Sequence, residues 1–156
     1  MDEPRWLNEQ EMRAWRGLLD TSRLLFEQVN RELSRRSGLS GADYEVLVQL
    51  SEAPERRLRM SELAAQSLSS KSRLSHQVSR LERQGWVQRE ECPTDRRGAF
   101  AVLTDKGFDV LAEAAKGHVD DVRRHLFDYL SPEQVQALGD ITTTLNSYLE
   151  TAVERD

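Results

Sequence analysis

The chain has 156 residues, a formal net charge of −5 and a single cysteine. This length predicts one domain that can bury about 68–70% of the surface of its unfolded chain. One cysteine excludes an internal disulfide, as expected for a protein of the reducing cytoplasm. No apolar stretch approaches the roughly 18 residues that a membrane-spanning helix needs. Residues 1–6 do not contain the apolar core of a signal peptide.

The N-terminal part of the chain is expected to be helical. Apolar residues recur every three or four positions over residues 8–37, which predicts a long amphipathic helix. Ser40 can cap a second helix, and Pro54 breaks it. Residues 57–59 are then expected to add a short strand, and Ser61 to cap the next helix.

The following helix is the most informative. It is expected to begin at Ser69 or Ser70 and to end at Gly85, a residue suited to the left-handed conformation that closes many helices. A narrow apolar stripe follows the helical period and consists of Leu74, Val78 and Leu81. The residues that point away from the stripe are hydrogen-bond donors suited to phosphates and base edges, namely Ser72, Arg73, His76, Ser79, Arg80 and Arg83. A solvated surface helix is the alternative.

A two-stranded hairpin is expected after this helix. Residues 86–90 and 100–103 are predicted strands, and residues 92–98 between them contain the proline, aspartate and glycine typical of turns. Two arginines at the tip can lie along DNA, because a narrow minor groove attracts them; an ordinary exposed hairpin is the alternative. Two short helices followed by a hairpin form the order of a winged helix-turn-helix.

Short motifs stand in order along this region: LA at 63–64, Ser72, VSRLERQGWVQR at 78–89, DRR at 95–97 and VLTDKG at 102–107. In this order they resemble the MarR family of bacterial transcriptional regulators, and the spacing agrees over nearly the whole chain. The resemblance implies a mainly α fold with a small β-wing, flanked by long N- and C-terminal dimerisation helices. It also implies that Asp95 braces Arg97 and that Arg97 enters the minor groove.

The C-terminal third is expected to be two helices. Thr104 can cap the first, which is predicted to reach Tyr129, and Ser131 followed by Pro132 starts the second. Their apolar stripes exceed what a small reading domain needs, which predicts a two-fold homodimer; a monomer is the alternative. We therefore expect a single MarR-like domain over residues 1–156, with dimerisation helices at 8–37 and 105–154 and a winged helix-turn-helix at 40–104.

The distribution of charge favours DNA as the partner of the reading region. Residues 71–104 hold seven Lys or Arg against four Asp or Glu, a net of +3, whereas residues 105–156 hold five against eleven, a net of −6. The local field near the DNA matters more than the total, since salt screens charges over about 8–10 Å. A winged helix that docks a protein instead of DNA is the alternative; it would tend to carry apolar residues on the exposed face.

We expect a repressor that binds an inverted-repeat operator as a homodimer, with half-sites about 34 Å apart. Arg73 and Gln77 are the candidate base readers because both side chains can make bidentate bonds, and Lys71 is a candidate phosphate clamp. The full set of expected DNA contacts is Lys71, Ser72, Arg73, His76, Gln77, Arg80, Asp95, Arg96 and Arg97.

Regulation is less readable from the residues. The resemblance implies a small aromatic acid or an oxidant as the signal. A crevice lined by aromatic side chains would suit the acid. The candidate lining residues are Trp15, Tyr44, Trp86, Phe108 and His118, and ordinary core packing is the alternative for each of them. Cys92 is expected to be exposed near the wing, but its acidic neighbours disfavour a thiolate, so we expect no redox sensing.

No enzyme, cofactor or metal site is expected. The histidines are scattered, and the sequence has neither a zinc-binding spacing, a phosphate-binding glycine loop nor a nucleophile elbow. His118 and His125, seven positions apart with Asp121 between them, are the nearest approach to a metal site, and such pairs recur by chance.

Overall fold

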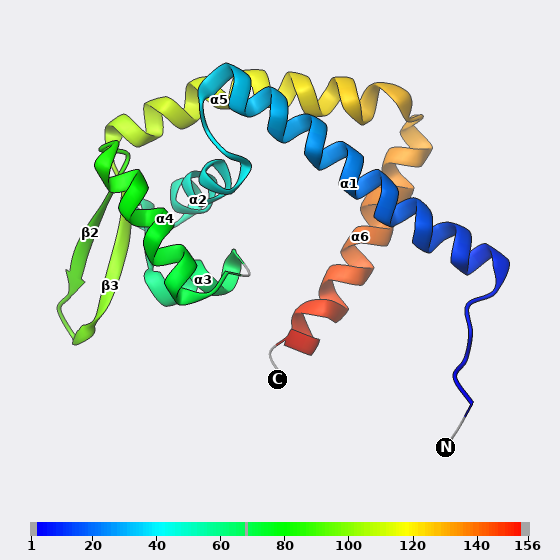
Figure 1. Cartoon of the computed structure of the whole chain (residues 1–156), viewed down its shortest axis with the longest axis horizontal. Helices are drawn as coiled ribbons and strands as arrows, with labels where there is room; N and C mark the ends of the chain where they lie inside the picture. The colour runs from blue at the N-terminus through cyan, green and yellow to red at the C-terminus, as the bar shows by residue number, and fades with distance from the viewer. Residues whose placement is uncertain (1–2, 68, 154–156) are drawn as a thin grey trace. The chain divides into compact units, whose positions relative to one another are not determined.

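The computed structural model describes residues 3–67 and 69–153, and the side chains of Arg96, Arg97, Ala152 and Val153 lie outside the described part. The chain divides into two compact units (Figure 1). The central unit is Asn30–Val119, and the terminal unit combines Met1–Val29 with Asp120–Asp156. Each is described by itself below.

The predicted mainly α fold with a small β-wing is confirmed. In chain order the elements are α1 (Glu9–Ser37), α2 (Gly41–Glu52), the 3-10 turn η1 (Pro54–Arg56), β1 (Arg57–Arg59), α3 (Met60–Gln66), α4 (Lys71–Arg83), β2 (Val87–Cys92), β3 (Asp95–Leu103), α5 (Asp105–His125), the 3-10 turn η2 (Phe127–Tyr129) and α6 (Pro132–Val153). The central unit contains α2 to β3 together with the end of α1 and most of α5.

Local hydrogen bonds define the ends of the helices in the central unit. The Ser40 and Ser70 hydroxyls accept the backbone N–H groups of Asp43 (3.1 Å) and Arg73 (3.2 Å), so both cap predictions are confirmed. Gly85 follows α4 with a φ of +76°, the conformation that favours glycine. The prediction that Ser61 caps α3 is wrong. That helix begins at Met60, because a carboxylate on its first turn already accepts the backbone N–H of the preceding residue.

The sheet has the order β1-β3-β2 and is antiparallel throughout. Val102 of β3 pairs with Arg57 on one side and with Gln88 on the other, so the predicted short strand at 57–59 is confirmed as an edge strand beside the wing. The register of the hairpin is irregular at Glu91/Cys92. Figure 1 shows the β2–β3 hairpin extending beyond the helices of this unit.

The core of the central unit joins every layer. It contains fully buried leucines from the helices and buried strand residues that face them, including Leu39, Leu47, Leu63, Leu74, Leu81, Val87, Ala101 and Leu103. These side chains hold α4 with its apolar stripe inward, which turns the opposite face of the helix toward solvent.

The terminal unit is helical. Ser131 caps α6 in a reciprocal pair with Gln134: the Ser131 hydroxyl accepts the Gln134 N–H at 3.3 Å, and the Gln134 side chain accepts the Ser131 N–H at 2.9 Å. The predicted end of the preceding helix at Tyr129 is wrong. Leu126 leaves helical geometry (φ −129°, ψ −67°), and a single 3-10 turn follows. No helix in the described residues is long and apolar enough to span a membrane.

Candidate nucleic-acid interface

The polar face of α4 is exposed as predicted. Leu74, Val78 and Leu81 are at most 1% exposed, whereas a run of residues on the other side is open to solvent: Lys71, Ser72, Arg73 and His76. This arrangement presents ammonium, guanidinium, imidazole and hydroxyl groups together, the donors that phosphates and base edges accept.

Two of the predicted contact residues, Gln77 and Arg80, are held by α2. Arg80 Nη2 donates to Asp43 Oδ1 at 2.5 Å, and Gln77 Nε2 donates to the same oxygen at 3.3 Å. The Asp43 side chain is 10% exposed and that of Arg80 is 50% exposed. Asp43 therefore anchors the Arg80 guanidinium from beneath and leaves its outer half free. Sequence analysis did not predict this anchor, because Asp43 lies 34 and 37 positions before its two partners.

A brace from the wing holds α4 from its other side. Arg89 of β2 donates through Nη1 to Glu82 Oε2 at 2.6 Å and to the Ser79 hydroxyl at 3.1 Å, and through Nη2 to the Ser75 carbonyl at 2.7 Å. The Arg89 backbone N–H also donates to Glu82 Oε1 at 2.9 Å. Sequence reasoning missed this brace; the signal was an acid and a base seven positions apart across the glycine turn at Gly85.

The wing residues are placed in part. Asp95 begins β3 and is exposed, and the backbones of Arg96 and Arg97 follow it in the strand, although their side chains lie outside the described part. Gly98 makes room for the carboxylate, because a Cβ there would lie 3.2 Å from Asp95 Oδ2. The roles of Asp95 and Arg97 remain predictions.

Cys92 differs from its expectation in two respects. It is 5% exposed, so the prediction of an exposed thiol is wrong: the residue ends β2 with its side chain turned inward. Its Sγ lies 3.4 Å from the Thr94 hydroxyl. Hydrogen bonds from Thr94 lower the pKa of the Cys92 thiol, whereas its acidic neighbours were expected to disfavour the thiolate.

The predicted effector residues are divided between the two units. In the central unit the rings of Tyr44 and His118 lie 4.5 Å apart between centroids, and burial raises the pKa of Tyr44. Trp86 packs against the core, and the Arg56 guanidinium covers the Phe108 ring at 3.9 Å. Trp15 belongs to the terminal unit and is half-exposed. An effector crevice remains a prediction.

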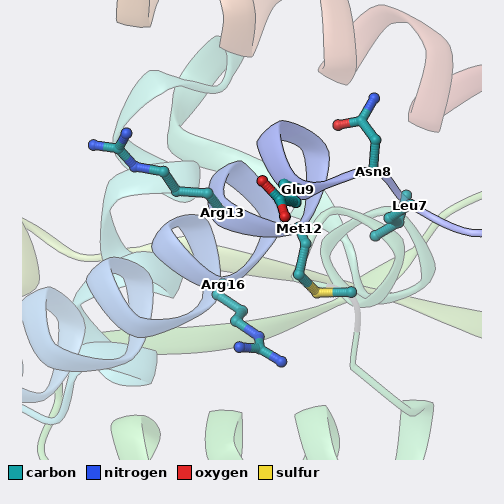
Figure 2. A pocket seen from close by; sticks show the side chains of 6 residues that line it. All are labelled: Leu7, Asn8, Glu9, Met12, Arg13 and Arg16. Atoms are coloured by element: carbon teal, nitrogen blue, oxygen red, sulfur yellow. The ribbon is translucent and has the colours of Figure 1, made fainter.

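A hollow in the terminal unit lacks converging groups. It lies at the start of α1, and Figure 2 shows that Arg13 and Arg16 point in different directions; the other lining residues are Leu7, Asn8, Glu9 and Met12. Binding sites bring a few polar groups together, which these do not. Among the described residues, no three metal-ligating side chains lie close enough to hold an ion.

Comparison with known proteins gives one consistent family. The model of the MarR family matches residues 37–98. Sco3205, a MarR family transcriptional regulator from Streptomyces coelicolor solved in complex with DNA, is 49% identical over 96% of this chain and 93% of that one, with a TM-score of 0.88. AbsC, a MarR family regulator of the same organism, is 44% identical over 95% and 99%, with a TM-score of 0.86. The transcriptional repressor MprA of Escherichia coli (strain K12) is 28% identical over 141 residues, 90% of this chain and 79% of that protein.

Proposed function

Because this chain belongs to the MarR family of transcriptional regulators, we propose that it represses transcription by binding an inverted-repeat operator as a homodimer. Like its relatives, it is a DNA-binding transcriptional regulator, and it is not an enzyme. The observation that carries the proposal is the exposed basic and polar face of α4, held outward by a fully buried stripe and positioned beside the wing.

The chemistry of this face favours DNA over a protein partner. Arg73 and His76 stand exposed where an interaction module would carry apolar side chains. We assign Arg73 to base edges, since a guanidinium can bond both acceptors of guanine, and Lys71 to the phosphates. Arg97 is assigned to the minor groove.

A homodimer is supported by apolar side chains that the single chain leaves open on α6. Ile141 is 57% exposed, Leu145 44% and Leu149 53%. These positions fall on one side of the helix, at a spacing of four residues. A two-fold pair would cover them and would place two copies of α4 about 34 Å apart, in successive major grooves.

A small aromatic acid is the effector class that we propose, on the support of the contact between Tyr44 and His118. Such an acid should release the protein from its operator. Titration of the bound complex with salicylate-like acids tests this, and a complex that survives the whole series would contradict it.

Binding to the duplex upstream of the chain's own gene tests the function directly. Fluorescence anisotropy at fixed salt should show tighter binding to that duplex than to an unrelated duplex of equal length. Arg73→Ala should lower the difference in binding free energy between the two duplexes by about 1–3 kcal/mol. Equal affinity of the wild-type protein for both duplexes would contradict specific recognition.

A further inference from the structure

A basic hollow of about 510 Å³ lies in the central unit between the start of α4, the end of β1 and the part of the β2–β3 hairpin that leads to its tip. Lys71 and Ser75 of α4 form one wall, Arg89 and Asp95 of the hairpin form another, and Arg59 of β1 closes it. Three cationic side chains thus face a single acidic one among the described residues that line the hollow.

The three cations differ in what already neutralises them. Arg89 is engaged with α4 through Glu82 and the two serines of the brace. Arg59 and Lys71 have no ion pair with any described residue. Arg59 is half-buried, and its guanidinium lies 5.6 Å from the centre of the Phe100 ring, which holds the side chain along the sheet without neutralising it.

Arg57 provides a natural comparison on the same strand. Its guanidinium also stacks on Phe100, at 4.1 Å, but it pairs with Glu90 at 3.4 Å and is not among the residues that line the hollow. Two arginines two positions apart therefore share a ring partner, and only Arg59 adds unpaired charge to the hollow.

We propose that this hollow receives the DNA sugar–phosphate strand that runs between the two grooves, and that Arg59 binds a phosphate of that strand. The inference rests on the proposed function. In a duplex, each backbone separates a major groove from a minor groove. With α4 in the major groove and the wing in the minor groove, the backbone between them crosses the gap between α4 and the wing, which is where the hollow lies.

The salt dependence of binding tests this contact. The probe is a random-sequence duplex of about 40 base pairs, roughly four helical turns, and affinity is measured by anisotropy from about 50 to about 200 mM KCl. Each phosphate contact contributes close to one unit to the slope of log K against log salt, so Arg59→Gln should flatten the slope by about one unit per chain and about two per dimer.

Two further variants separate a phosphate contact from a structural effect. Arg57→Gln loses a stacked guanidinium from the same ring and should keep the wild-type slope. Arg59→Lys keeps the positive charge and should restore most of the wild-type slope. Arg59→Gln should also lower the affinity for the upstream duplex and for the random duplex by the same factor, on the order of tenfold, because phosphates carry no sequence information.

A wild-type slope in Arg59→Gln would overturn the inference while leaving the proposed function intact. Equal losses in Arg57→Gln and Arg59→Gln would overturn it as well, since they would trace the effect to Phe100. A wild-type protein that binds neither duplex would remove the proposed function and this inference together. Matching thermal unfolding curves for the variants establish that all are folded.

Discussion

Gly107 shows what a single residue contributes to positioning the wing. A Cβ at this site would lie 2.1 Å from the Trp86 carbonyl oxygen and 2.7 Å from Leu103 Cδ1. The Thr104 hydroxyl accepts the Gly107 N–H at 3.0 Å and donates to the Gly85 carbonyl at 2.7 Å. The first turn of α5 therefore rests directly on the backbone that leaves α4, and only glycine leaves room for it.

Gly107→Ala should destabilise the protein by about 1–3 kcal/mol or more, because the methyl group would have to displace backbone rather than a flexible side chain. Gly139→Ala in α6 is the matched control: nothing lies within 4 Å of a Cβ there, and alanine is favoured over glycine inside a helix by about 1 kcal/mol. Urea midpoints measure both. Equal midpoints for the two variants would contradict the close approach seen at Gly107.

The relation between α4 and β2 is set by side chains as well as by the short connection between them. Only residues 84–86 separate the two elements, and the Arg89 brace bonds the strand to Glu82 and to the Ser75 carbonyl across that turn. Both charged side chains of the pair are 30% exposed. Since the helix and the wing are assigned to different grooves, this brace fixes the angle at which they meet DNA.

Glu82→Gln should therefore weaken operator binding by about 1–2 kcal/mol, through lost charge-assisted bonds in a partly exposed pair, and leave the salt slope unchanged. The control is Glu113→Gln, which removes the ion pair between Glu113 and Lys116. This pair has the same 2.6 Å distance as the Glu82–Arg89 pair, but its side chains are 74–78% exposed. The control variant should therefore bind DNA as the wild type does. Anisotropy on the upstream duplex measures the affinities. A reduced slope in Glu82→Gln would contradict a purely positioning role.

Periodicity and cap chemistry were enough to predict the elements and the outward face of α4, because both are local properties of the chain. The side-chain partners of that face were not local. Asp43 reaches residues 34 and 37 positions later in the sequence, so Gln77 and Arg80 looked as free as Arg73 from the helical period alone. The burial of Cys92 depends on which way the irregular end of β2 turns, and alternation along a short strand does not determine that.

At the scale of the whole molecule, the two units expose different kinds of surface. The central unit contains all the buried residues of the main hydrophobic cluster and presents polar side chains on α4. The terminal unit leaves large apolar side chains open: besides those already named on α6, Trp15 is 49% exposed, Leu18 52% and Tyr148 70%. Scattered apolar residues are normal on a surface, but long runs at helical spacing indicate a partner.

The homodimer can be tested by charging one side of α6 and then the other. Ile141→Glu places a carboxylate among the exposed apolar residues, where burial in an interface would cost the ion its hydration. Thr143→Glu adds the same charge about 200° further round the helix. Light scattering should give a dimer mass for the wild type and for Thr143→Glu, and about half that mass for Ile141→Glu.

The same pair separates assembly from DNA reading. A chain that has lost its partner keeps its own α4 and wing, but it loses the gain that comes from linking two half-site contacts, which can reach about 10²–10⁴ in affinity. Ile141→Glu should therefore bind a full inverted repeat no more tightly than a single half-site, whereas Thr143→Glu should prefer the full repeat as the wild type does. If Ile141→Glu remained dimeric, the two-fold contact would have to be built from a different surface, and the half-site spacing of one turn would lose its physical basis.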